Sequence, residues 1–136
     1  MDLDKAREFI RNNHRAVMLT WNPSGRPQTS PVGVGIDADG RPLISTAETA
    51  VKTRNLRANP NLTLCVTTDA FIGEWIQIDG TAEVLSVPEA VEPLVEYYRS
   101  ISGEHPDWDD FRAAMVRDRH VLIRVDITRA GPDIRG

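Results

Sequence analysis

The sequence has a single cysteine, no long apolar run and no excess of positive charge, and these shortages exclude several classes of protein. With one cysteine, Cys65, the 136-residue chain can form neither an internal disulfide nor a cysteine-based zinc site. No apolar run approaches the roughly 20 residues that span a bilayer, so we expect no membrane insertion. The formal net charge is −4, which argues against nucleic acid as a partner, because backbone binding needs a basic surface.

The remaining composition is that of a globular protein. Hydrophobic residues make up 40% and charged residues 26% of the chain, and a length of 136 residues suits a single domain over residues 1–136. Residues 1–5 lack the basic segment and apolar stretch of a secretory signal, so we expect a cytoplasmic protein. Cys65 lies between Leu64 and Val66 and is predicted to be an unreactive thiol in the core.

Apolar periodicity predicts six strands and four helices. Alternation of apolar and polar residues, bounded by turn residues, predicts strands at 16–21, 28–36, 42–46, 62–67, 75–85 and 121–127. Helical spacing predicts a helix over 3–13 capped by Asp2, one over 49–58 that Thr49 could cap, one following Ser86 and one capped by Asp107 or Asp110. Ser86 and Glu89 have the spacing of a capping box for the third helix.

The order of these elements predicts the fold class. Runs of strands with inserted helices argue against a doubly wound parallel sheet and favour a mainly β (α+β) fold, an antiparallel barrel of six strands with peripheral helices. Gly80 interrupts the long strand and predicts a bulge or a barrel corner there, because strands must bend to close a small barrel.

Two suggestive patterns have simpler explanations. The run Gly33-Val34-Gly35-Ile36-Asp37-Ala38 fits a dinucleotide-binding fingerprint by letter, but it lies in a predicted strand, whereas that fingerprint requires a helix start. We therefore assign the glycines to a close approach of backbone or ligand. His105, Asp107, Asp109 and Asp110 could suggest a metal cluster, but helix capping explains the aspartates, and we predict no metal.

Residues 46–57 are the most informative segment for function. The segment joins a strand end to a helix start, where free amides and the helix dipole favour a phosphate. Lys52 and Arg54, with nearby threonine hydroxyls, add donors within one turn. The alternative is a solvated basic helix that packs through Leu56, and physical chemistry alone leaves the two interpretations evenly balanced.

Four stretches of the chain, in order, resemble one known family. They are Gly-Arg-Pro-Gln at 25–28, Ala-Val-Lys-Thr-Arg-Asn-Leu-Arg at 50–57 before Asn59-Pro60, Asp-Gly-Thr-Ala-Glu-Val at 79–84, and Tyr-Arg at 98–99 with the run 103–112. Together they cover almost the whole chain and resemble the pyridoxamine 5′-phosphate oxidase-like, deazaflavin-dependent enzymes. The last stretch is similar to an actinobacterial branch that uses coenzyme F420, an 8-hydroxy-5-deazaflavin.

The resemblance implies an FMN-binding type of split β-barrel that works as a homodimer, with two cofactor sites at the subunit interface. The cofactor phosphate would lie against Lys52 and its neighbours, while residues of the second strand face the ring system and Trp75 is the candidate for ring packing. Some relatives carry arginine where this chain has Ala50. The cofactor-binding residues implied in this way are Gln28, Ser30, Val32, Thr46, Ala50, Val51, Lys52, Thr53, Asn55, Trp75 and Gln77.

The implied function is that of an F420-dependent oxidoreductase, which transfers a hydride between reduced deazaflavin and a small organic substrate that the sequence does not identify. In such an enzyme the cofactor carries the chemistry, and no residue of the sequence is nominated as catalytic. One alternative is an FMN-dependent oxidase or flavin reductase of the same family. Another is a non-catalytic protein that binds or carries F420.

Overall fold

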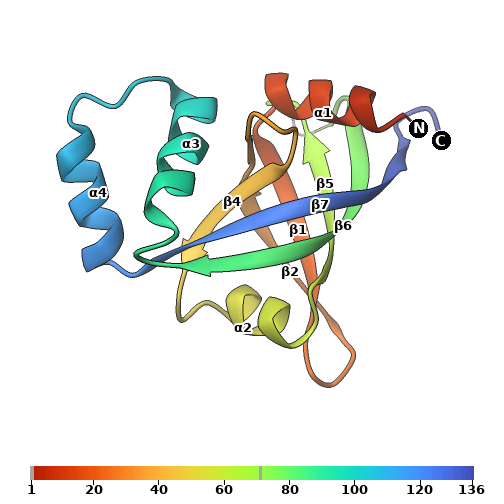
Figure 1. The fold of residues 1–136 in the computed structure, drawn as a ribbon. Helices are drawn as coiled ribbons and strands as arrows, with labels where there is room; N and C mark the ends of the chain where they lie inside the picture. Colours follow the sequence, from red (N-terminus) through yellow and green to blue (C-terminus); the bar gives the residue numbers. More distant parts are fainter. Residues whose placement is uncertain (1, 71) are drawn as a thin grey trace.

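One curled antiparallel sheet with four helices around it makes up the computed structural model, which describes residues 2–70 and 72–136 (Figure 1). The helices are α1 (Leu3–Asn12), α2 (Val51–Ala58), α3 (Val91–Ser102) and α4 (Trp108–Arg117). The strands are β1 (Arg15–Trp21), β2 (Pro27–Gly33), β3 (Gly35–Ile36), β4 (Pro42–Ala47), β5 (Asn61–Thr67), β6 (Trp75–Ser86) and β7 (His120–Asp133).

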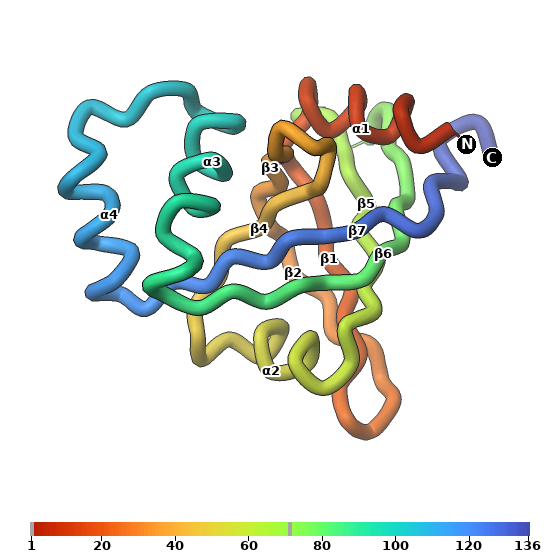
Figure 2. The backbone as a smooth tube through the Cα atoms, in the orientation of Figure 1, coloured from red at the N-terminus to blue at the C-terminus, as the bar shows by residue number. Residues whose placement is uncertain are grey.

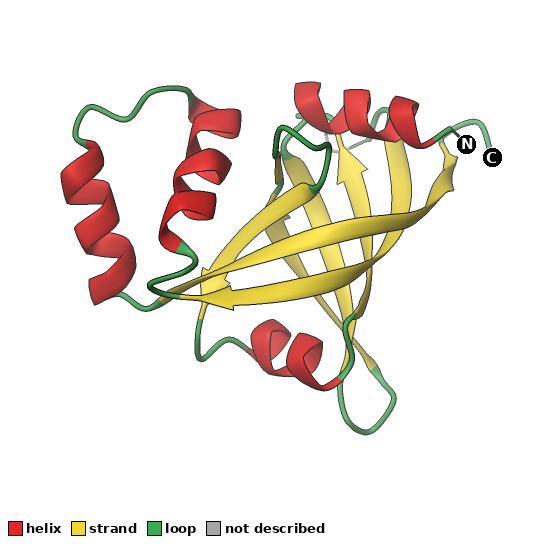
Figure 3. Cartoon of the chain, in the orientation of Figure 1, coloured by secondary structure: helices red, strands yellow, loops and turns green. Residues whose placement is uncertain are grey.

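The sheet has seven strands in the order β2-β1-β5-β6-β7-β4-β3, and each neighbouring pair is antiparallel. α1 and α2 lie at opposite ends of the curled sheet, and α3 and α4 lie beside it (Figure 3). This arrangement confirms the predicted mainly β split-barrel fold. The prediction of six strands was one short, because the expected strand over 28–36 is broken at Val34 into β2 and β3 (Figure 2).

The break follows from close packing of α3 on two glycines. A Cβ atom on Gly33 would lie 2.8 Å from the Tyr97 hydroxyl oxygen, and one on Gly35 would overlap Ser100 Oγ. Between them, the Val34 amide donates to the carbonyl of His14, the residue just before β1, at 2.9 Å. The glycines therefore permit a close approach, as predicted, and the approaching element is a helix of the same chain.

The predicted irregularity at Gly80 is confirmed. The pairing of β6 with β7 shifts register between Asp79 and Gly80. A Cβ atom at Gly80 would lie 2.5 Å from Val125 Cγ1 and 2.6 Å from the Asp126 carbonyl oxygen, so no larger residue fits without movement.

Two apolar clusters hold the fold together. The larger fills the inside of the curled sheet and is closed at its two ends by Ile10 of α1 and Leu56 of α2. The smaller lies on the outer face of β4 and β7, where Leu43 and Leu122 pack against Leu94 of α3. Alternation along each strand decides which side chains face inward.

The helix starts differ in how well the sequence predicts them. Asp2 and Asp107 cap α1 and α4 as expected, each side chain accepting from a backbone amide of the first turn. The predicted caps of the other two helices are wrong: α2 begins after Ala50 with no side-chain cap, and α3 begins after Ala90. The capping box fails because Ser86 is the last residue of β6, paired with Val121, and its hydroxyl contacts Glu48 and Arg57 instead.

The placement predicted for Cys65 is also wrong. It is half-buried on the outer face of β5, opposite Val17 and Gln77, because alternation puts Leu64 and Val66 inward and the residue between them outward. Partial burial still raises the pKa of the thiol, which disfavours the reactive thiolate.

Among residues 2–70 and 72–136, no helix is both long and apolar enough to cross a membrane.

Candidate functional site

Three side chains anchor the helix α2, which carries the predicted phosphate site. The Thr53 hydroxyl is buried and donates to the Ala47 carbonyl at 2.7 Å, and Leu56 enters the barrel core. Arg57 donates to Glu48 Oε1 at 2.6 Å and to Ser86 Oγ at 2.7 Å, which ties the helix to the loop before it and to the end of β6. Contacts near both ends of α2 therefore fix the position of the helix and with it the position of its first turn.

The first turn of α2 retains unused donors and positive charge. Within the described part of the chain, Lys52 and Arg54 have no carboxylate within 4.0 Å, and the amides of Val51 and Lys52 have no acceptor. Arg57, in contrast, is neutralised by Glu48. Free amides at a helix start and two unpaired cations are the features that bind a phosphate or another anion.

The nearby carboxylate of Glu48 does not cancel this positive charge. Hydrogen bonds from Arg57 and, more weakly, from Ser86 hold the pKa of Glu48 below its usual value, so it stays ionised and paired. An anion at the start of α2 would consequently meet a neutralised Glu48–Arg57 pair and the free charges of Lys52 and Arg54.

On the inner face of the sheet, the predicted ring-facing residues form a row along β2. Gln28, Ser30 and Val32 pair with Thr20, Met18 and Ala16 of β1 and so point inward with them. Ser30 Oγ is buried and has no hydrogen-bond partner among the described residues. A buried hydroxyl without a partner is rare in native proteins and is expected where a ligand supplies the missing bond.

A chain of hydrogen bonds connects this row to α2. Asn55 Nδ2 donates to Thr20 Oγ1 at 3.1 Å, and Thr20 Oγ1 donates to Gln28 Oε1 at 3.3 Å. Asn55 is 3% exposed and Thr20 is 0% exposed, so the network is internal. Asn55, predicted as a cofactor contact, thus has its amide engaged inside the protein, next to the site.

Trp75 and Gln77 lie apart from the other predicted residues. Trp75 pairs with Thr67 of β5 and Gln77 with Cys65, and Cys65 pairs on its other side with Val17 of β1. This register puts Trp75 and Gln77 on the outer face of the sheet. Gln28 and Ser30 point to the opposite face. Within one chain, therefore, the two groups do not lie together. Thr46, half-buried beside Val121 at the end of β4, is on the inner face.

The outer face of β2, β1, β5 and the first half of β6 is apolar in part. None of the described residues that point outward from it is buried, and Val17 and Trp21 are 41% and 39% exposed. The helices pack elsewhere: α1 and α2 contribute to the inner cluster, and α3 and α4 pack at the cluster over β4 and β7. We name this surface, around Val17, Trp21, Cys65, Trp75 and Gln77, the open sheet face.

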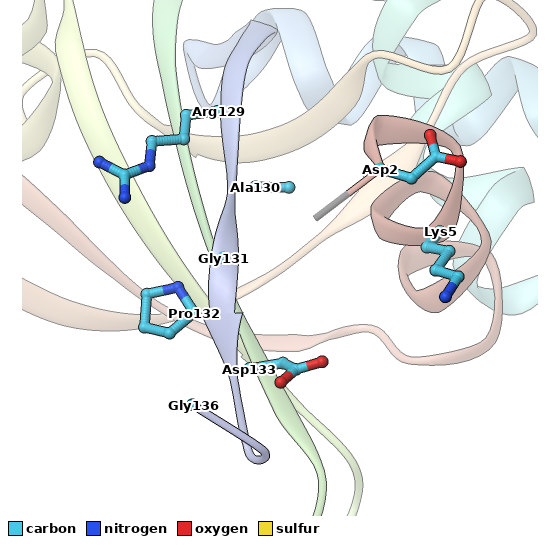
Figure 4. Close-up of a pocket in the computed structure, with 8 residues that line it drawn as sticks. All are labelled: Asp2, Lys5, Arg129, Ala130, Gly131, Pro132, Asp133 and Gly136. Atoms are coloured by element: carbon cyan, nitrogen blue, oxygen red, sulfur yellow. The ribbon is translucent and has the colours of Figure 1, made fainter.

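None of three surface depressions among the described residues is lined by the first turn of α2 or by a residue of β2. One of about 660 Å³ lies between the start of α1 and the end of β7, where Arg129 and Pro132 project from one side of the strand and Asp133 from the other, toward Lys5 (Figure 4). One of about 170 Å³ is lined by Phe9 and Trp75. The third, of about 380 Å³, lies between Trp21 and the end of α2. Of the predicted cofactor residues, Trp75 lines one of the three.

Comparison with known proteins identifies the family. The family model described as pyridoxamine 5′-phosphate oxidase matches residues 3–131. The chain belongs to this family. Solved structures agree in fold: a conserved hypothetical protein from Mycobacterium tuberculosis is 21% identical, with a TM-score of 0.77 over 96% of this chain and 82% of its own.

Other structurally similar proteins are described by different functions. An F420 reductase is 17% identical, with a TM-score of 0.69 over 92% of this chain and 94% of its own. A heme storage protein from Vibrio cholerae is 15% identical, with a TM-score of 0.69 over 98% of this chain and 96% of its own. At such low identities, the likeness to these solved structures establishes the fold alone.

Sequence reasoning missed Thr20 as part of the site. The signal was present, because Thr20 has the same strand parity as Ala16 and Met18 and is a polar residue at a core position. Nothing in the local sequence pointed to its partner Asn55, which is 35 residues away and reaches it only in the folded chain.

Proposed function

We propose that this chain is an F420-dependent oxidoreductase, which transfers a hydride between reduced deazaflavin and a small organic substrate, and that it works as a homodimer. The observation that carries the proposal is the unpaired, positively charged start of α2, joined by a buried hydrogen-bond chain to the inward polar row of β2. A phosphate-binding end and a ring-binding row in continuous contact suit a cofactor that has both a phosphate and a planar ring.

The phosphate would be held by the amides of Val51 and Lys52 and by the ammonium of Lys52, with Arg54 within the same helical turn. Ala50 offers no side-chain donor where some relatives have arginine. Gln28 and Ser30 would meet polar atoms of the ring, and the buried, unpartnered Ser30 hydroxyl fits a group that supplies an acceptor or a donor. The residues that are present therefore fit a phosphorylated ring cofactor.

A second copy of the chain would complete the site. Trp75 and Gln77 project from the open sheet face and cannot reach a ligand on the inner face of their own β2. If the open sheet face of a second copy lies beside the edge strand β2 and the start of α2, these side chains can border the cofactor of the other subunit. The proposed homodimer would therefore be required for a complete site, since each site would contain residues of both chains.

When bound, the deazaflavin supplies the hydride chemistry. The protein would orient the ring through Gln28 and Ser30, anchor the phosphate through Lys52, and exclude water by subunit packing. No described acid has a position that nominates it as a proton donor, and a proton needed by the product can come from solvent.

FMN is the competing cofactor, because the family is named after an oxidase and FMN also combines a phosphate with a tricyclic ring. Yellow purified protein with a flavin absorption band and no affinity for deazaflavin would favour it. Heme is a further candidate through the heme storage protein with the same fold, and a Soret band would reveal it. A carrier would bind F420 and oxidise none of the reduced form with any acceptor.

The decisive experiment is a fluorescence titration of the purified protein with F420 and with FMN, repeated on Lys52→Ala. We expect micromolar-scale binding of F420, weakened by more than about 1.5 kcal/mol in the variant because a charge-assisted phosphate contact is lost. The matched control is Lys5→Ala, since Lys5 is the other lysine of the chain and lies on α1. Equal affinity of Lys52→Ala and the unaltered protein would exclude Lys52 from the site.

A further inference from the structure

We infer that Thr20 is a positioning residue that fixes the amide of Gln28 toward the bound cofactor and couples it to the helix that holds the phosphate. The inference rests on the proposed function and extends it to a residue that does not itself line the site. Thr20 lies on the inner face of β1, is 0% exposed, and stands between Asn55 of α2 and Gln28 of β2.

The donors and acceptors of a threonine hydroxyl determine the direction of donation along the hydrogen bonds from Asn55 through Thr20 to Gln28. A hydroxyl has one proton to donate, and the Asn55 amide nitrogen already donates to Thr20 Oγ1 at 3.1 Å. The Thr20 proton is then free for Gln28, whose Oε1 accepts it at 3.3 Å. Because its oxygen is occupied, Gln28 presents Nε2 as its free polar group.

The second contact of Gln28 agrees with this assignment. Gln28 Nε2 donates to the carbonyl of Thr29 at 3.1 Å, so one of its two protons is used and the other is left for a ligand. An N–H donor beside the Ser30 hydroxyl matches a ring edge with carbonyl acceptors. Such a donor stabilises negative charge that a ring carbonyl gains on reduction.

The apolar surroundings indicate that the Thr20 hydroxyl is retained for this purpose. The neighbouring inward residues of β1, Ala16 and Met18, are buried and apolar, and valine has nearly the shape of threonine. A core position that needed only packing would take an apolar residue without a buried hydroxyl, whose burial is favourable only when it is hydrogen-bonded.

The first test uses the ligand-free protein and needs no activity. In Thr20→Val, the 15N-detected side-chain amide signals of Gln28 and Asn55 should move toward those of free amides, whereas in Thr20→Ser they should stay near their original positions. Thr128→Val is the matched control, because Thr128 is an exposed threonine on β7. Unchanged Gln28 and Asn55 signals in Thr20→Val would overturn the inference.

The second test measures the coupling to the cofactor. We expect Thr20→Val to bind F420 about 5- to 10-fold more weakly, as for the loss of one buried hydrogen bond, with a shifted absorption band of the bound ring. Thr20→Ser should bind within about twofold of the unaltered protein, since it keeps the donor. Equal affinity and an equal spectrum for Thr20→Val would also overturn the inference.

Three further outcomes remain distinguishable. If Thr20→Val does not fold, the unaltered protein still reports the network: a Thr20 hydroxyl proton protected from exchange, with a nuclear Overhauser contact to the Asn55 amide, supports it, and rapid exchange contradicts it. If the unaltered protein binds neither F420 nor FMN, the proposed function fails and the role of Thr20 fails with it. If the protein binds while Thr20→Val is indistinguishable, the role of Thr20 alone fails.

Discussion

At the residue scale, two neighbouring hydroxyls on the inner face of the sheet have opposite situations. The Thr20 hydroxyl has partners on both sides, whereas Ser30 Oγ is buried without one among the described residues. An unsatisfied buried hydroxyl costs free energy in the folded state, on the order of 1–3 kcal/mol. We expect this free-energy cost of the Ser30 hydroxyl to be removed when a bound ligand supplies the missing hydrogen bond.

We therefore predict that Ser30→Ala leaves the free energy of unfolding unchanged or raises it by up to about 1 kcal/mol, while it weakens cofactor binding. Urea denaturation and fluorescence titration measure the two effects. Ser45→Ala serves as the control, because Ser45 Oγ is 3.1 Å from His120 Nδ1 and its removal should lower stability without affecting binding. A clear loss of stability in Ser30→Ala would show that the hydroxyl has a partner in solution.

At the scale of elements, α2 depends on a polar clamp as well as on its apolar face. The clamp consists of Glu48, Arg57 and Ser86, and it joins the loop before α2, the last turn of α2 and the end of β6. Thr53 and Leu56 fix the buried side of the same helix. The start of α2 is consequently preorganised, which lowers the cost of ordering it around a phosphate.

The clamp predicts a pH dependence of stability. The pKa of Glu48 is lowered in the folded protein, chiefly by the hydrogen bond from Arg57, so its contribution is present above the unfolded pKa and is lost as the pH falls through the folded pKa. Glu48→Gln should therefore be less stable than the unaltered protein at pH 7. The difference should shrink as the pH falls below about 4.5, the usual glutamate value.

Urea denaturation at several pH values measures this difference. Glu89→Gln is the control, because Glu89 is exposed and makes no ion pair among the described residues, so its difference from the unaltered protein should be small throughout. A stability difference for Glu48→Gln that stays constant from pH 7 to pH 3 would contradict the clamp.

At the scale of the whole molecule, the helices leave one surface of the barrel to other contacts. The open sheet face exposes 41% of Val17 and 39% of Trp21, next to Trp75 and Gln77. Exposed apolar residues on a sheet face are typical of an interface with another chain.

We predict that the protein is a dimer in solution and that Val17→Lys converts it to a monomer, because a twofold interface would then bury two unpaired ammonium groups. Analytical ultracentrifugation measures the change, and F420 affinity should fall with it. Val116→Lys is the matched control, since Val116 is 50% exposed on α4, away from the open sheet face. A dimeric Val17→Lys variant would place the interface elsewhere.

The sequence by itself determined most of the elements and the direction of their side chains. Alternation along β5 and β6 and the caps Asp2 and Asp107 depend on neighbours a few residues apart, so local physics sufficed for them. The unused donors at the start of α2 were predictable for the same reason, since a helix start leaves amides free whatever the rest of the chain does.

Only the tertiary structure decided the features that depend on distant partners. The strand break at Val34 needs the packing of α3, Ser86 leaves its predicted cap for Glu48 and Arg57, and Thr20 gains its role through Asn55. The same holds for Trp75. It lies on the opposite face of the sheet from Gln28, and this follows only from the pairing of β2 with β1, of β1 with β5 and of β5 with β6. These relations bring together residues far apart along the chain, and a pattern of neighbouring residues has no information about them.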